Sequence, residues 1–131
     1  MTFESLSHSR FDCKYHLVFV PKYRKKKLYG EIRSYLGPVF HELAQQKGCT
    51  ILKGNMVQDH VHMLIQLRPD VSVSKTVQLF KGKSSYIIRK EFPHLEEFYW
   101  GKADSFWGDG FFVETVGQIN ETTIKEYIRN Q

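Results

Sequence analysis

Three runs of β-branched and aromatic residues predict three β-strands. The runs are CKYHLVFV at 13–20, CTILKGNMV at 49–57 and HVHMLIQL at 60–67, and residues of these types favour a pleated sheet. The first run ends at Pro21, as a strand that stops there would. Only the polar pair Gln58 and Asp59 separates the second run from the third, which predicts a hairpin. We therefore expect a sheet that is at least partly antiparallel.

Apolar residues recur at helical spacing in three other segments. The first lies between residues 32 and 47, with Gly48 placed as a C-terminal cap. Pro38 lies inside this segment, so the helix either kinks there or begins near it. Ser72 can cap a second helix, and Asn120 can cap a last one with the sequence ETTIKEYIRNQ.

Two further strands are predicted between the second and the last helix. FYWGKADSFW at 98–107 and FFVETV at 111–116 flank the turn signal Gly108, Asp109, Gly110. The complete order is βαββαββα, which predicts an α+β fold in which helices pack on a largely antiparallel sheet. No repeat or linker interrupts the pattern, so residues 1–131 are interpreted as a single domain.

The composition favours a globular protein with an anionic partner. Of the 131 residues 41% are hydrophobic and 15% aromatic, and the formal net charge is +5 with a pI near 9.2. Such a charge favours nucleic acid as the partner. No apolar stretch approaches the roughly 18 residues of a spanning helix, and the N-terminus has no h-region, so we expect a cytoplasmic protein without a membrane partner. Cys13 and Cys49 form no C-x-x-C pair and are expected to be small buried hydrophobes.

Two histidines provide the first candidate chemistry. Side chains alternate along a strand, so His60 and His62 point to the same face and Val61 to the other. Two neutral imidazoles can hold a divalent metal and leave positions open for a substrate. An H-x-H sequence on its own is more often a coincidence than a metal site.

The last helix provides a candidate nucleophile. Tyr127 and Gln131 are four residues apart and share one face, while Lys125 and Arg129 point away from it. A tyrosine that attacks a backbone phosphate forms a phosphotyrosine diester, and this preserves the energy of the broken bond for rejoining without ATP. Because a tyrosine with a pKa of about 10 is a weak nucleophile at neutral pH, a metal would have to polarise the phosphate. The alternative role for Tyr127 is a packing aromatic on an amphipathic helix.

Taken together, these motifs resemble a known family. MVQDHVHMLIQL, then FFVETVG and EYIRNQ, with the opening CKYHLVFVPKYRKK, resemble the single-tyrosine HUH transposases of bacterial and archaeal insertion sequences, the TnpA type. HUH denotes two histidines separated by a hydrophobic residue. The resemblance covers nearly the whole chain and includes Lys81-Gly82-Lys83-Ser84 in the second helix. It implies the HUH version of the ferredoxin-like or RRM-like fold.

The resemblance also implies a reaction and a set of site residues. His60 and His62 would be the metal-binding pair, Gln131 a third ligand, and Tyr127 the nucleophile. The ion would be Mg²⁺ or Mn²⁺. The substrate would be single-stranded DNA with hairpins near element ends, cut to a 5′-phosphotyrosine and a free 3′-hydroxyl. The resemblance further implies a homodimer in which the tyrosine helix of one subunit completes the site of the other.

Basic residues in two places are candidates for DNA contact. The loop PKYRKKKLYG at 21–30 places cations beside aromatic rings, which suits phosphates and stacked bases, although a charge run is often only a solvated loop. The DNA-binding candidates are Lys22, Tyr23, Arg24, Lys25, Lys26, Lys27, Lys81 and Lys83. KGKSS at 81–85 lacks the glycine and the preceding strand of a P-loop, so no nucleotide cofactor is expected.

Two other classes of function remain open from the residues. One is a non-catalytic DNA-binding or RNA-binding regulator built on the same fold. The other is a metal-dependent hydrolase that uses HVH and activated water and needs no tyrosine. Four other histidines have no partner at an informative spacing and are interpreted as surface or structural residues. They are His8, His16, His41 and His94.

Overall fold

Four antiparallel strands form the main sheet, in the order β4-β5-β3-β6. The computed structural model describes residues 4–6, 9–11, 13–22, 30–57, 60–96, 105–117 and 121–130. The sheet strands are β3 (Cys13–Phe19), β4 (Cys49–Val57), β5 (His60–Leu67) and β6 (Phe112–Val116). A separate hairpin of β1 (Glu4–Leu6) and β2 (Ser9–Phe11) precedes them, and the sequence patterns did not predict it.

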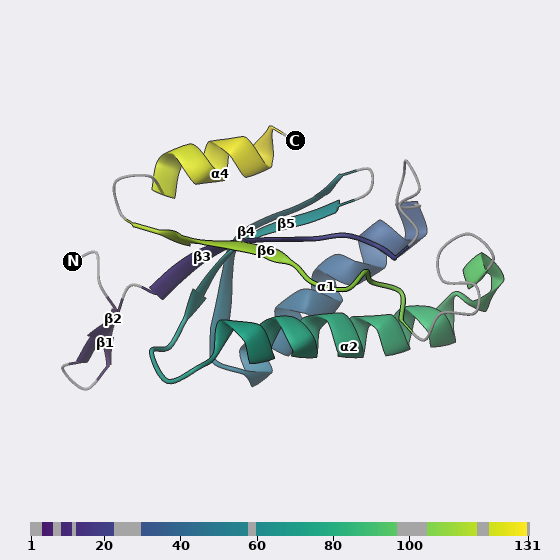
Figure 1. The fold of residues 1–131 in the computed structure, drawn as a ribbon, viewed down its shortest axis with the longest axis horizontal. Coiled ribbons are helices and arrows are strands. Elements are labelled where there is room, and N and C mark those ends of the chain that lie inside the picture. Colours follow the sequence, from purple (N-terminus) through teal and green to yellow (C-terminus); the bar gives the residue numbers. More distant parts are fainter. Residues whose placement is uncertain are drawn as a thin grey trace.

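The helices cover both faces of this sheet. They are α1 (Gly30–Gln46), α2 (Val73–Glu91) with the short 3-10 helix η1 (Pro93–Leu95) after it, and α4 (Glu121–Arg129). Figure 1 shows α1 and α2 on one side of the sheet and α4 on the other. The expected α+β architecture with an antiparallel sheet is confirmed. No helix among the described residues is both long and apolar enough to span a bilayer.

The larger core lies between the sheet and the helices α1 and α2. Alternate residues of the central strands point into it, among them Leu17 and Phe19 of β3 and Val61 of β5. The rings of Phe19 and Trp107 meet edge to face with centroids 4.8 Å apart. Burial of these apolar side chains makes this face the main source of stability.

The first helix begins at Gly30 and continues through Pro38, so Pro38 does not start it. Because proline has no backbone N–H, the helix loses one internal hydrogen bond there. Gly48 has φ of 66°, as expected for the left-handed residue that ends a helix. The predicted cap at Ser72 is also confirmed, since its side chain accepts a hydrogen bond from the backbone N–H of Lys75.

The strand predicted over residues 98–107 is not confirmed. Residues 97–104, and Asn120 with its predicted cap, lie outside the described part of the chain. Residues 105–107 form only an isolated bridge between Trp107 and Pro21. A strand would turn Phe106 and Trp107 to opposite faces, but both are buried in the same core, on the side of α1 and α2. The backbone N–H of Phe106 donates to Ser85 Oγ and the indole N–H of Trp107 donates to Ser84 Oγ, so α2 determines the conformation here.

Candidate active site

The second face of the sheet, under α4, carries the paired histidines. β4 and β5 form the expected hairpin, with Val57 opposite His60. Val61 is buried in the core on the α1 and α2 side, and the imidazoles of His60 and His62 lie together with ring centroids 5.0 Å apart. The prediction that alternation turns both imidazoles to one face is confirmed.

His62 is held in its neutral form. It is 3% exposed, and its pKa is lowered from 6.5 to about 4, first by burial and then by repulsion from His60 and His16. Its Nε2 atom is buried and has no hydrogen-bond partner among the residues that the structure describes. A neutral imidazole with an unused ring nitrogen is the form that binds a metal ion.

A third histidine, His16, lies beside this pair. It comes from the centre of β3, is buried, and its Nε2 lies 3.4 Å from Nδ1 of His62. On its other side Nδ1 lies 2.9 Å from a carboxylate oxygen of Glu114 on β6. The sequence analysis assigned no role to His16 or Glu114. A polar residue in the middle of an apolar strand was the available signal, on the opposite face from Leu17 and Phe19.

The tyrosine of the last helix lies over these histidines. Ile128 is buried against Leu64 and Val116 of the sheet, with Ile124 packed against the same cluster. Tyr127 remains 49% exposed. Its ring centroid is 5.7 Å from that of His62 and 5.9 Å from that of His16. Within one chain, a solvent-accessible phenol and the histidine pair therefore share one site.

Polar contacts fix both ends of α4 on the sheet. At its start, the ammonium of Lys14 on β3 pairs with the carboxylate of Glu121, and Lys125 lies 3.0 Å from the other oxygen of that carboxylate. The hydrogen bond from Lys14 is the main cause of the lowered pKa of Glu121. At its end, the amide of Asn55 on β4 donates to the carbonyl oxygen of Ile128 over 3.0 Å. The second contact lies directly after Tyr127.

The described residues supply only part of a metal coordination shell. Among them, no group of three or more His, Cys, Asp or Glu side chains could hold an ion. Gln131, the predicted third ligand, and Asp59, beside the pair, lie outside the described residues. His60 and His62 therefore suit a site with two protein nitrogens and further positions for oxygen ligands.

The predicted DNA-binding residues occupy different environments. Residues 23–29, and with them Tyr23, Arg24, Lys25, Lys26 and Lys27, lie outside the described part of the chain. Lys22 is exposed, with its ammonium 4.0 Å from a carboxylate oxygen of Asp109. The ammonium of Lys81 donates to the carbonyl oxygens of Gly108, at 2.6 Å, and Gly110, at 2.8 Å. Lys81 thus holds the turn before β6, and its contact with DNA stays a prediction.

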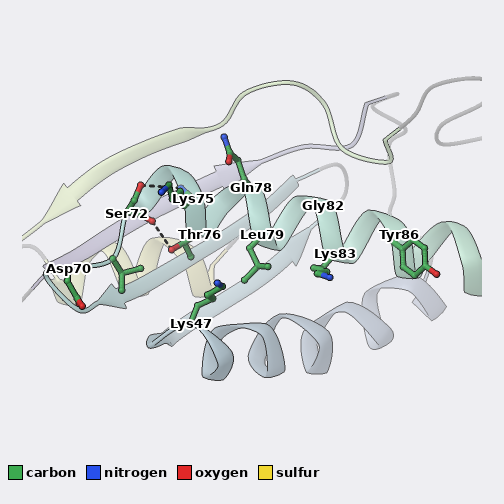
Figure 2. A pocket seen from close by; sticks show the side chains of 11 residues that line it. Lys47, Asp70, Ser72, Lys75, Thr76, Gln78, Leu79, Gly82, Lys83 and Tyr86 are labelled. Carbon is green, nitrogen blue, oxygen red and sulfur yellow. Dashed lines mark hydrogen bonds between the residues drawn. The ribbon is translucent and has the colours of Figure 1, made fainter.

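Lys83 lines a basic cavity of about 820 Å³ beside α2. Figure 2 shows Lys47, from the end of α1, reaching toward the side of α2 that carries Leu79 and Lys83. Lys75 also lines this cavity, near the capped start of α2. Three lysines against one carboxylate, Asp70, in this lining favour an anionic ligand such as a phosphate backbone.

Comparison with known proteins finds transposases. A family model described as "Transposase IS200 like" matches residues 9–131. The transposase for insertion sequence element IS200 of Salmonella typhimurium is 41% identical over 128 residues, which cover 98% of this chain and 82% of that protein. The ISDra2 transposase TnpA of Deinococcus radiodurans is 29% identical over 121 residues, covering 92% and 85%.

Two solved structures share the fold. A Deinococcus radiodurans protein assigned as a transposase superposes with a TM-score of 0.71 and 30% identity, covering 90% of this chain and 89% of its own. A REP-associated tyrosine transposase bound to a REP hairpin superposes with a TM-score of 0.69, covering 88% and 64%. At 12% identity, the second likeness shows the fold alone.

Proposed function

The chain belongs to the IS200-like transposase family, and we propose that it nicks and rejoins single-stranded DNA through Tyr127, with Mg²⁺ or Mn²⁺ held by His60 and His62. The observation that carries this proposal is the position of Tyr127. Its ring lies against His62 and His16 while half of the side chain stays open to solvent. A tyrosine that served only to pack α4 would be covered, as Ile128 is.

The proposed reaction exchanges one phosphodiester for another. The phenolic oxygen of Tyr127 forms a bond to the scissile phosphorus, and the bond from phosphorus to the 3′ oxygen breaks. The phenol loses its proton and the leaving oxygen gains one, so the products are a 5′-phosphotyrosine and a 3′-hydroxyl. A second DNA end with a free 3′-hydroxyl reverses the step, and no nucleotide is consumed.

The histidines fit a divalent cation in this role. His62 is neutral and its Nε2 is unused by the described residues, which is the state a ligand needs before it binds. When bound, the ion would polarise the phosphate and offset the charge that develops on it. Gln131 stays the predicted third ligand, and the remaining positions would be filled by oxygen atoms of DNA or water.

The charge distribution supports single-stranded DNA as substrate. The chain carries a net charge of +5, and lysines 47, 75 and 83 line one cavity beside α2. The loop at 21–30 would add further cations and aromatic rings, which suit unpaired bases. The REP-associated relative is bound to a hairpin, and we propose that hairpins near element ends are also what this chain recognises.

We further propose that the protein acts as a homodimer. Among the described strands β6 lies at the edge of the main sheet, and its residues Phe112 and Val113 are exposed, as is Phe111 just before it. An open edge with apolar side chains is a surface that a second copy can cover. Tyr127 already meets the histidines of its own chain, so the site as observed does not require exchange of tyrosine helices.

One assay tests the chemistry. The protein is incubated with labelled, hairpin-bearing single-stranded DNA and Mn²⁺, and an adduct that survives SDS is measured. We expect Tyr127→Phe to abolish the adduct, and Tyr35→Phe, at an exposed tyrosine on α1, to form it normally. We expect His60→Ala to keep DNA affinity and lose cleavage.

The same assay separates the alternatives. A hydrolase would release free product with both the unaltered protein and Tyr127→Phe. A non-catalytic regulator would retard the DNA in a gel without cutting it. Either outcome would refute Tyr127 as the nucleophile.

A further inference from the structure

Three strands bring a row of polar side chains together on the α4 side of the sheet. His16 on β3 is directly opposite Glu114 on β6. The pairing of Val18 with His62 and of His16 with Leu64 makes His16 and His62 diagonal neighbours on β3 and β5. The order in space is therefore Glu114, His16, His62, and then His60, whose ring is 5.0 Å from that of His62.

The contacts within this row of side chains determine which ring nitrogens of His16 and His62 carry protons. A carboxylate oxygen only accepts hydrogen bonds, so Nδ1 of His16 carries the proton in its 2.9 Å contact with Glu114. In neutral His16 the other nitrogen, Nε2, is then an acceptor. With His16 in this form, the facing atom, Nδ1 of His62 at 3.4 Å, donates to it. A neutral imidazole has one N–H, so Nε2 of His62 is left with a lone pair.

The surroundings of His62 agree with this assignment. Its Nε2 is buried without a hydrogen-bond partner among the described residues, so no described acceptor would satisfy a proton placed there. The ring is 3% exposed, and burial favours its uncharged form. The Nδ1–H tautomer set by His16 therefore leaves a lone pair on Nε2 of His62, the nitrogen without a described partner.

We propose that Glu114 and His16 are positioning residues that hold His62 as the Nδ1–H tautomer and so present its Nε2 to a divalent cation. This inference rests on the proposed metal site of His60 and His62. Histidine ligands in proteins usually donate their second N–H to a neighbouring acceptor, which fixes the ring and makes it a better ligand. Here the acceptor is a second buried imidazole, itself oriented by a carboxylate from the edge strand.

If His16 served only to pack against its neighbours, position 16 would not require an imidazole. His16 is 4% exposed, and the rings of Phe112 and Tyr127 lie edge to face with it. An apolar side chain would suit that setting at least as well as an imidazole. Only a side chain that accepts at one end and donates at the other can bridge His62 to Glu114.

The test uses glutamine as the conservative replacement. The oxygen of a glutamine at position 16 can accept from Nδ1 of His62 while its amide donates to Glu114, whereas leucine can do neither. Free Mn²⁺ is titrated by electron paramagnetic resonance. We expect His16→Leu to weaken Mn²⁺ binding about 10- to 100-fold and His16→Gln to stay within a few-fold of the unaltered protein.

Two further variants guard against misfolding as the explanation. Glu114 is exposed on the edge strand, so Glu114→Ala should fold, and we expect Mn²⁺ binding up to about tenfold weaker. Thr115→Ala, at the neighbouring exposed residue paired with Tyr15, should leave Mn²⁺ binding unchanged. Equal loss of binding in His16→Gln and His16→Leu would overturn the proposal.

A second readout needs no metal. Nitrogen-15 spectra of histidine side chains distinguish the two tautomers, and we expect His62 in the metal-free protein to be protonated at Nδ1. Protonation at Nε2 with normal Mn²⁺ binding would overturn the positioning role alone. If the unaltered protein failed to bind Mn²⁺, the metal site itself would be refuted.

Discussion

The two faces of the main sheet are built from the same strands and differ in almost every other respect. On the side of α1 and α2, alternate residues such as Leu17, Phe19 and Val61 enter a large apolar core. On the side of α4, the buried apolar cluster consists of Leu64, Val116 and Ile128. The intervening positions on that side hold histidines and charged residues.

The two faces therefore have separate roles: the face under α1 and α2 stabilises the fold, and the face under α4 carries the reactive groups. The first face can keep the sheet folded by apolar burial. The second face can then hold polar groups that a core would not tolerate without partners, such as the unpaired Nε2 of His62. α4, held there by few apolar contacts and by polar contacts at its two ends, carries the proposed nucleophile.

The largest expected effect comes from damage to the apolar face. Phe80 on α2 is fully buried against Phe40, and Phe80→Ala should lower the free energy of unfolding by about 3–5 kcal/mol. Because Tyr127 and the histidines are on the other face, the DNA adduct formed per folded molecule at saturating DNA should not change. Urea unfolding followed by tryptophan fluorescence, combined with the adduct assay, measures both quantities.

A milder variant makes this prediction sharper. Phe80→Leu retains more of the side-chain volume and should lose less stability than Phe80→Ala. If either variant lost adduct formation in its folded fraction as completely as Tyr127→Phe, the two faces would not be separable.

A smaller effect is expected from protonation of the polar face. The pKa of His62 is about 4 when folded, against an ordinary value of 6.5. Between these values the unfolded chain binds a proton that the folded chain does not, so stability is complete above pH 6.5 and falls as the pH drops toward 4. The full loss corresponds to roughly 3 kcal/mol.

This pH effect is measured by urea unfolding in EDTA at several pH values between 6.5 and 4. His62→Gln removes the titrating ring, so its stability should fall less over the same interval. Phe80→Ala should keep the pH dependence of the unaltered protein, because it acts on the other face. Parallel curves for His62→Gln and the unaltered protein would contradict a buried neutral imidazole.

The positions of the paired histidines, the last helix and the hairpin could be predicted from local sequence patterns. Alternation along HVHMLIQL is sufficient to place His60 and His62 on one face, and helical spacing places Tyr127 on the last helix. Only the family resemblance implied that this helix meets the histidines. The hairpin at Gln58 and Asp59 followed from its short polar connection. These features depend on neighbours in the sequence, where a period of two or of 3.6 is sufficient.

Features that depend on strand register could not be predicted. His16 lies 46 positions from His62 and 98 from Glu114, and only the pairing of β3 with both β5 and β6 brings the three together. Residues 105–107, the described end of the segment predicted as a strand, depart from that prediction for a similar reason. Local propensity favoured a strand, but Ser84 and Ser85 of α2 bind Phe106 and Trp107 in another conformation.

The smallest effect tests how α4 is held over the polar face. The bond from the Asn55 amide to the carbonyl of Ile128 spans 3.0 Å and adjoins Tyr127. Asn55→Ala should remove about 1 kcal/mol, which corresponds to about a fivefold smaller equilibrium constant for the docking of α4 on the sheet. We therefore expect hydrogen exchange in α4 about fivefold faster, adduct formation slower by at most about fivefold, and little change in urea unfolding of the core. Thr123→Ala, at an exposed position of the same helix, should change neither quantity. Equal rates in the two variants would mean that the contacts at the start of α4, with the packing of Ile124 and Ile128, are sufficient to position the tyrosine.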